Sequence, residues 1–240
     1  MPAEPQAPKS LADPVALAAR RALVGAAHIA PIRALAARIG AERGAPVPVP
    51  DPIDGGVGAR MLLLLETPGP AVLRTGFVTR DSANGTAANL FRFLAEAGIA
   101  RTDTLIWNAV PWLIHQEGAR NRAPRRAEVA AAAPYLGPLL DLLPRLTVAV
   151  LAGRFAAGAA PALAAHRPGL PLILIPHPSP TYVCTAPEVA ARIRRGLSEA
   201  GPHPAEDGGS MAAAPSLALR AGSAYMRGNG PRSGRLRHGL

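Results

Sequence analysis

The chain has 240 residues, of which 49% are hydrophobic and 18% are charged. This composition suits a folded domain and excludes a disordered polyelectrolyte. No apolar stretch reaches the roughly 18 residues that a membrane-spanning helix requires, and the N-terminus lacks the apolar segment of a secretory signal, so we expect a cytoplasmic protein without membrane contact. The only cysteine, Cys184, excludes an internal disulfide, a cysteine-rich zinc site and a four-cysteine iron–sulfur cluster.

The charge is strongly positive, because 26 Lys+Arg stand against 16 Asp+Glu and give +10. An excess of this size suits an anionic partner such as nucleic acid. Only Lys9 is a lysine, however, and the codon bias of a GC-rich genome enriches arginine without any selection for binding. Charge alone therefore leaves both explanations open. Residues 58–197 contain 15 Arg and 8 acidic residues, so most of the excess lies in the expected folded core.

The N-terminal part of the chain is predicted to contain one long helix. Residues 1–14 are rich in Pro and Ala, and we expect them to fray. Large apolar residues recur at helical spacing over residues 15–43, which predicts a single helix. Residues 45–58 combine Pro and Gly and are predicted to be a linker. We expect a flexible N-terminus over residues 1–14 and a helix with its linker over residues 15–57. An α/β domain over residues 58–200 and a disordered basic tail over residues 201–240 are expected to follow.

The middle of the chain alternates apolar runs with helical patterns. The apolar runs, each predicted to be a strand, are residues 61–65, 104–110, 146–152 and 170–175. The predicted helices are residues 86–98, 125–143, 154–166 and 187–199, the second with a kink or break at Pro134. Apolar strands separated by helices indicate a parallel sheet covered on both faces. The predicted class is α/β, a three-layer α/β/α fold with a central four-stranded, mainly parallel sheet and an additional N-terminal helix.

Polar residues stand where the predicted strands end. Glu66 follows the first strand, Asn108 lies near the end of the second, and His177 comes just after the fourth. The carboxyl ends of parallel strands meet at one edge, where α/β proteins hold their ligands. Singly, each residue has an ordinary explanation, since a strand-end histidine is often structural and an asparagine often caps a turn. Together, an acid, an amide and an imidazole predict a site at this edge.

The motifs around these residues resemble the uracil-DNA glycosylase superfamily. The matching segments are Glu66-x-Pro68-Gly69, Gly76-Phe77-Val78, Asn108, Pro124-x-Arg126-x-Glu128-Val129 and His177-Pro178-Ser179-Pro180. The resemblance covers about residues 58–199. It implies a monofunctional glycosylase that hydrolyses the N-glycosidic bond of uracil, or of a related deaminated or damaged base, in base-excision repair of DNA. It also implies that no cofactor or metal is needed. We further expect a monomer that associates with the nucleoid of a bacterial cell when it binds DNA.

A glycosylase must extrude the target base and stabilise the negative charge that develops on it as the bond to the sugar breaks. The resemblance implies that His177 donates a hydrogen bond to uracil O2 and that Asn108 binds the O4/N3 edge and so rejects cytosine. Phe77 is the candidate for stacking on the base, with packing in the core as its alternative. Glu66 and Thr67 are candidates for handling the attacking water. Pro68 and Gly69 are candidates for substrate contact.

The implied DNA contacts lie in two loops. Ser179, Pro180 and the neighbouring backbone amides would hold a phosphate, and the two prolines make this loop stiff. Thr181 or, as the better candidate, Tyr182 would fill the space that the extruded base leaves in the stack. Four arginines before the second helix of the domain are candidates for phosphate contact, with a solvated loop as the alternative: Arg120, Arg122, Arg125 and Arg126.

The chain departs from the family pattern in the first motif. Leu65 stands where the family usually has Gly, and Thr67 stands where the active branches have Asp or Asn. A hydroxyl holds water but is not a base at neutral pH, so we expect slow hydrolysis assisted by Glu66, or another damaged base as substrate. Covalent trapping of the base is disfavoured, because Asn121 occupies the position of the trapping histidine. His115 is expected to be structural.

Two other functions remain open on the sequence alone. The fold can serve as a DNA- or lesion-binding module with little or no catalysis, as Leu65 and Thr67 indicate. The protein can also be an unrelated α/β enzyme that acts on a small molecule. Against the latter, the sequence has no G-x-G-x-x-G, no G-x-x-x-x-G-K-[ST] and no G-x-S-x-G motif.

Overall fold

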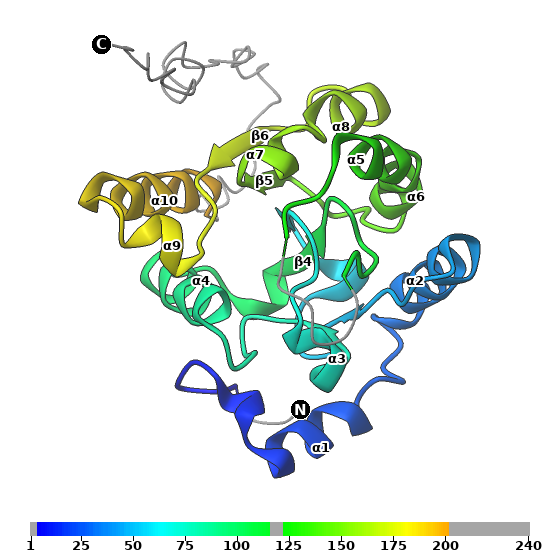
Figure 1. Cartoon of the computed structure of the whole chain (residues 1–240), viewed down its shortest axis with the longest axis horizontal. Helices are drawn as coiled ribbons and strands as arrows, with labels where there is room; N and C mark the ends of the chain where they lie inside the picture. Colours follow the sequence, from blue (N-terminus) through cyan, green and yellow to red (C-terminus); the bar gives the residue numbers. More distant parts are fainter. Residues whose placement is uncertain (1–3, 116–121, 202–240) are drawn as a thin grey trace, which may run out of the picture. The chain divides into compact units, whose positions relative to one another are not determined.

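Four parallel strands form the centre of the fold, in the order β4-β2-β5-β6 (Figure 1). The computed structural model describes residues 4–115 and 122–201. The strands are β2 (Met61–Leu65), β4 (Thr104–Asn108), β5 (Val148–Ala152) and β6 (Leu172–Ile175). Every pairing between neighbouring strands is parallel. Each of the four strands coincides with a predicted strand or lies within one. The predicted α/β class with a four-stranded parallel sheet is therefore confirmed.

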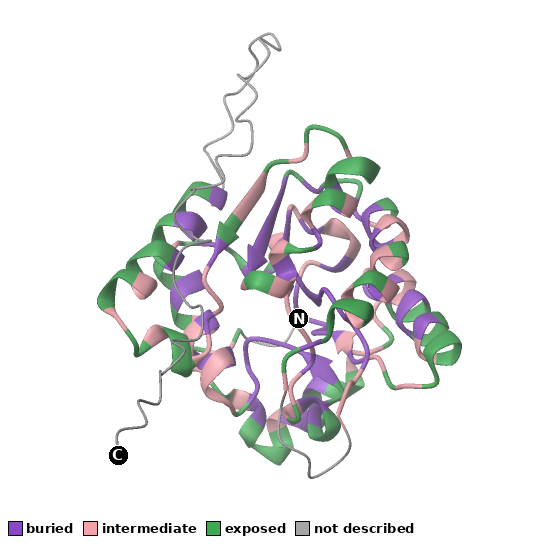
Figure 2. Ribbon diagram, turned by 45° about the horizontal axis from the view of Figure 1, so that its top comes forward, coloured by how far each residue is buried: buried purple, intermediate pink, exposed green. Residues whose placement is uncertain are grey.

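Helices cover both faces of this sheet, which explains why its strands are apolar throughout. On one face, Leu62, Leu64 and Trp107 pack in a cluster with α2, α5, α6 and α8. On the other face, Met61 and Leu63 pack against α4 and α10. The bounds are α2 (Ala30–Arg43), α4 (Gly85–Glu96), α5 (Arg126–Ala132), α6 (Leu136–Asp141), α8 (Ala160–His166) and α10 (Pro187–Ala200). Figure 2 shows that these helices are buried toward the sheet and exposed on their outer sides.

Three predicted helices are divided in the structure. The prediction of one helix over residues 15–43 is wrong, because α1 (Pro14–Ala22) ends before Gly25 and α2 starts at Ala30 with Pro31 in its first turn. Glycine weakens a helix interior, and proline is favoured where a new helix begins. The predicted helix 154–166 consists of α7 (Arg154–Ala157) and α8. The predicted break at Pro134 is confirmed, since the short helix η4 (Ala133–Tyr135) separates α5 from α6.

The predicted linker and most of the described N-terminus belong to the folded structure. β1 (Val49–Pro50) pairs in parallel with β3 (Phe77–Val78) as a second, two-stranded sheet. Leu11 is fully buried against Phe77, so fraying is wrong for the stretch that holds Leu11. The remaining short helices are η1 (Ser10–Ala12), η2 (Gly56–Gly58), α3 (Ala71–Thr75), η3 (Arg101–Asp103) and α9 (Pro180–Val183). The predicted basic tail, from residue 202 onward, lies outside the described residues.

A buried ion network that the sequence did not predict connects these segments. Arg20 of α1 pairs with Asp51 and, at 3.0 Å, with Asp81. Arg101 pairs with Asp54 and with Asp81, both at 2.9 Å. Burial, followed by the charge of Asp51, raises the pKa of Asp54 to about 7. Buried ion pairs of this network therefore join α1, the predicted linker and the segment after β3.

Candidate functional site

The carboxyl ends of the four strands lie at one edge of the sheet, as parallel pairing requires. Leu65 at the end of β2 lies opposite Asn108 at the end of β4. The next residues remain tied together, because the Ala109 amide donates to the Leu65 carbonyl at 2.7 Å. On the other side, the Gly153 amide after β5 donates to the carbonyl of Ile175, the last residue of β6, at 2.9 Å. The loops that carry Glu66, Asn108 and His177 therefore start from the same edge.

Gly153 lets Glu66 and His177 approach each other. Its φ of +95° is one that residues with a side chain rarely adopt. A Cβ atom at this position would lie 2.5 Å from Glu66 Oε1 and 3.1 Å from His177 Cβ. The acid after β2 and the imidazole after β6 thus flank one glycine. In the sequence, Gly153 directly follows the predicted strand of residues 146–152. Its role as a spacer is visible only in the structure.

Asn108 is buried, with 2% of its surface exposed. Its Oδ1 atom accepts no hydrogen bond within the described part of the chain. A buried carbonyl oxygen without a donor costs about 1–3 kcal/mol, so proteins seldom leave one at the end of a strand without a reason. Oδ1 is therefore a candidate acceptor for a ligand N–H at the edge where α/β folds bind their ligands.

His177 is half-buried, and its protonation state follows from its surroundings. The Ser179 amide donates to Nδ1 at 3.2 Å, so the neutral ring carries its proton on Nε2. Burial lowers the pKa of His177 to about 4. At neutral pH the side chain is therefore an uncharged imidazole whose Nε2–H is available as a hydrogen-bond donor.

Glu66 has an environment that opposes its ionisation. Burial raises the pKa of this carboxyl, while the backbone amide of Phe155 and the positive charge of Arg154 act in the opposite direction. The Phe155 amide donates to Oε1 at 3.3 Å. Thr67 follows as a half-buried residue and Pro68 is buried. A Cβ atom at Gly69 would meet nothing within 4 Å, so this glycine borders open space.

The loop that begins with His177 is held by α4. Asn89 Nδ2 donates to the Pro178 carbonyl at 3.0 Å. Gly85 at the start of α4 touches the Pro180 ring so closely that a Cβ there would lie 2.3 Å from it. Tyr182 is 55% exposed, with its ring centroid 6.3 Å from that of His177. Ser179 is half-buried and Thr181 is exposed on the same segment.

Two other predicted site residues have different surroundings from those expected. Phe77 is 2% exposed and packs against Leu11 and Leu17, which favours the core alternative over stacking on a base. Arg122 is held by the Glu128 carboxylate at 2.6 Å rather than left open for a phosphate. Burial and ligand contact cannot be distinguished for Phe77 by sequence spacing, because both require an apolar ring after the first motif.

The other predicted residues of the arginine loop divide between described and undescribed parts. Arg125 and Arg126 are exposed. Arg120 and Asn121 lie outside the described residues. His115 is half-buried, and neither ring nitrogen has a hydrogen-bond partner within the described part of the chain.

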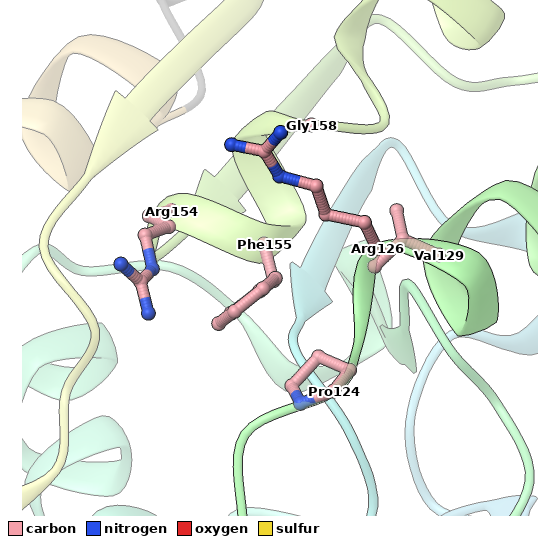
Figure 3. Close-up of a pocket in the computed structure, with 6 residues that line it drawn as sticks. All are labelled: Pro124, Arg126, Val129, Arg154, Phe155 and Gly158. Carbon is pink, nitrogen blue, oxygen red and sulfur yellow. The ribbon is translucent and has the colours of Figure 1, made fainter.

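A hollow of about 430 Å³ adjoins the candidate site on the α5 and α7 side (Figure 3). Its lining residues are Pro124, Arg126, Val129, Arg154, Phe155 and Gly158. The backbone amide of Phe155 is the one that binds Glu66, which connects the hollow to the acid. Neither Asn108 nor His177 lines it. The sequence did not identify this hollow; the one available signal was Arg154 directly after a strand-end glycine.

Residues 4–115 and 122–201 contain no candidate metal site and no candidate membrane span. No group of three or more His, Cys, Asp or Glu there is arranged to hold a metal ion. No helix in these ranges is both long and apolar enough to cross a membrane.

Comparison with known proteins identifies one family. The model of the uracil DNA glycosylase superfamily matches residues 52–194, which include β2, β4, β5, β6 and the residues at their carboxyl ends. No curated protein matches the chain.

Proposed function

Since the chain belongs to the uracil DNA glycosylase superfamily, we propose that it hydrolyses the N-glycosidic bond of uracil, or of a related deaminated or damaged base, in DNA. The superfamily supports a DNA glycosylase-like function. The observation that carries the finer proposal is the buried Oδ1 of Asn108, which has no hydrogen-bond partner among the described residues, at the edge where Glu66 and His177 also lie. The proposed reaction initiates base-excision repair and uses no cofactor. We propose that the protein acts as a monomer on DNA in the cytoplasm.

Asn108 is proposed to select the base. Its Oδ1 accepts from uracil N3–H, and its Nδ2 donates to uracil O4. Cytosine has an acceptor at N3 and donors at N4, so the same amide meets it with the wrong partners. A site that hydrogen-bonds a specific edge can discriminate by roughly 10⁴–10⁵. An unpaired acceptor in the free protein supports this role, because uracil N3–H satisfies it.

His177 is proposed to stabilise the leaving base. As the C1′–N1 bond breaks, the electron pair moves onto the base and negative charge grows on O2. A neutral imidazole with its proton on Nε2 can donate to that oxygen and retains the proton afterwards. One such donor is worth about 10²–10³ in rate.

Glu66 and Thr67 are proposed to complete the hydrolysis. The oxygen of a water molecule bonds to C1′ of the positively charged sugar, and the released proton passes to the Glu66 carboxylate and then to solvent. The Thr67 hydroxyl holds that water, and Pro68 and Gly69 border the substrate. Glu66 must be ionised to accept a proton. Because its pKa is raised, we expect the rate of base release to increase as the pH rises through the raised pKa of Glu66.

DNA is proposed to bind across the same edge. Ser179 and Pro180 approach a phosphate, and Tyr182, exposed beside His177, fills the space left by the extruded base. Thr181 is the second candidate for that space. The exposed arginines around the site, Arg126 among them, supply positive charge for the backbone.

The direct test is release of free uracil from a labelled oligonucleotide. We expect release by the wild-type chain and a loss of about 10²–10³ in kcat for His177→Ala. His166→Ala is the matched control, because this histidine lies on α8 and pairs with Asp141 instead of facing the site. Equal rates for His177→Ala and the wild type would contradict the role of His177.

A second candidate function is a DNA-binding module that recognises damaged bases without removing them. Thr67 supports it, because this residue stands where the active branches carry a side chain that orients water better. Tight binding of uracil-containing DNA without release of uracil, at every enzyme concentration, would favour this module over the glycosylase.

A further inference from the structure

The hollow beside Glu66 combines an aromatic ring with two cations. Figure 3 shows Phe155 lying between the side chains of Arg154 and Arg126, with Pro124 on a third side. The Arg154 guanidinium lies 4.6 Å from the centroid of the Phe155 ring. Phe155 is half-buried, while both arginines are exposed. The ring is an apolar surface of the hollow, Arg154 lies over it in a cation–π contact, and Arg126 lines the same hollow.

The charge of the hollow selects an anion. Within the described part of the chain, no acidic residue lines it. Neither Arg126 nor Arg154 forms an ion pair within residues 4–115 and 122–201, whereas the neighbouring Arg122 is occupied by Glu128. Two guanidinium groups that form no ion pair in these ranges, around an apolar floor, suit a ligand with a flat aromatic part and a phosphate.

The size and position of the hollow narrow the ligand further. A volume of about 430 Å³ lies within the roughly 300–1,000 Å³ of sites for small organic groups. The hollow adjoins the candidate site, because the backbone amide of its lining residue Phe155 donates to the Glu66 carboxylate at 3.3 Å. A ligand there lies beside the excised base and not in its place, since Asn108 and His177 are outside the lining.

We propose that this hollow binds an unpaired nucleotide adjacent to the excised one, with its base stacked on Phe155 and its phosphate held by Arg126 and Arg154. The proposal rests on the proposed function for the identity of the nucleic acid. Bases stack on aromatic rings and on arginine planes regardless of their sequence. Stacking on Phe155 requires a base that has left its pair, so we expect the protein to prefer single-stranded DNA or the frayed neighbourhood of a lesion.

The test measures binding of the full-length protein to a labelled oligo(dT) strand by fluorescence anisotropy. The strand carries a tetrahydrofuran in place of one central nucleoside. This probe contains no uracil, so binding is measured without turnover. Phe155→Leu should weaken binding to the single strand about 10-fold or more, because the stacking surface is lost. Phe155→Tyr keeps the ring and should bind as the wild type does. The loss on the matching duplex should be much smaller.

The two arginines give an independent measurement that does not disturb the core. Arg126→Gln and Arg154→Gln should each lower the slope of log affinity against log salt by about 0.7, the value for one phosphate on a single strand. Arg145→Gln is the control, because Arg145 is exposed and precedes β5, at the opposite edge of the sheet. These variants decide the question if Phe155→Leu unfolds.

Three results would overturn the proposal: equal affinity of Phe155→Leu and the wild type, equal losses on single strand and duplex, or unchanged salt slopes in both arginine variants. The outcome is separable from that of the uracil assay. A chain that releases no uracil and still shows Phe155-dependent binding keeps the nucleotide site and loses the glycosylase. A chain that releases uracil while Phe155→Leu binds normally keeps the glycosylase and loses this site.

Discussion

At the scale of single residues, Gly153 determines whether the candidate acid and imidazole can share one location. A side chain at this position would meet Glu66 Oε1 at 2.5 Å and His177 Cβ at 3.1 Å. The acid and the imidazole were expected at one edge from the order of the strands. The spacer between them was not, because close packing against a Cβ has no signature in the sequence.

Gly153→Ala should lower kcat for uracil release about 10-fold or more, because displacements of about 1 Å at a catalytic site are that costly. Gly169→Ala is the matched control: its φ is +85°, so it carries similar backbone strain, but its added Cβ meets nothing within 4 Å. Gly153→Ala should lose more stability than Gly169→Ala in thermal unfolding, because only its Cβ meets other atoms, and only Gly153→Ala should lose activity as a folded protein. Equal losses of activity in the two variants would show that Gly153 is only a backbone requirement.

His177 also makes a prediction about stability and pH. Its pKa is about 4 in the folded protein and about 6.5 in an unfolded chain. Between these values the unfolded state binds more protons, so the neutral, buried ring stabilises the fold above pH 6.5, and this contribution is lost as the pH falls toward 4. Asp54, whose pKa is raised to about 7, acts in the opposite direction over a similar range. A variant is therefore needed to separate the two.

Urea unfolding of the wild type and of His177→Gln at pH 7 and pH 4.5 provides that separation. Asp54 is present in both proteins, so its contribution cancels in the comparison. We expect the wild type to lose about 2 kcal/mol more than the variant over this interval. Parallel pH dependence in the two proteins would mean that His177 is not held neutral by the fold.

At the scale of elements, the strands were predictable and the N-terminal segments were not. A strand buried on both faces is apolar throughout, and that pattern is visible in β2 and β5. The helix predicted over residues 15–43 failed because a periodic apolar pattern continues across the interruption between α1 and α2. The linker prediction failed because the partners of Asp51 and Asp54 are Arg20 and Arg101, which lie far away in the sequence.

The ion network should contribute strongly to stability. Arg101→Met leaves the carboxylates of Asp54 and Asp81 buried without their shared partner, and we expect a loss of about 3–5 kcal/mol in the free energy of unfolding. The loss should shrink at pH 5, because protonation neutralises the released carboxyls. Arg194→Met removes an equally short but exposed pair with Glu96 and should cost less than about 1 kcal/mol. Similar costs for both variants in chemical denaturation would contradict the importance of this network.

At the scale of the whole molecule, the arginines behind the net charge of +10 are not equivalent. Arg126 and Arg154 border the site edge and its adjoining hollow, whereas Arg20 and Arg101 are buried in the ion network and unavailable to any partner. Net charge alone could not make this distinction. The sequence left Phe77 open between stacking on the base and packing in the core, and the packing against Leu11 and Leu17 favours the core.

Base discrimination by the whole protein tests most directly whether Asn108 selects uracil. Release of free base is compared for oligonucleotides that carry one uracil or one cytosine at the same position, with the wild type and with Asn108→Ala. We expect release of uracil and not of cytosine by the wild type, and a collapse of uracil release in the variant, because Oδ1 and Nδ2 of Asn108 are the atoms proposed to bind the base edge. Undiminished release of uracil by a folded Asn108→Ala protein, or equal release of both bases by the wild type, would contradict this role.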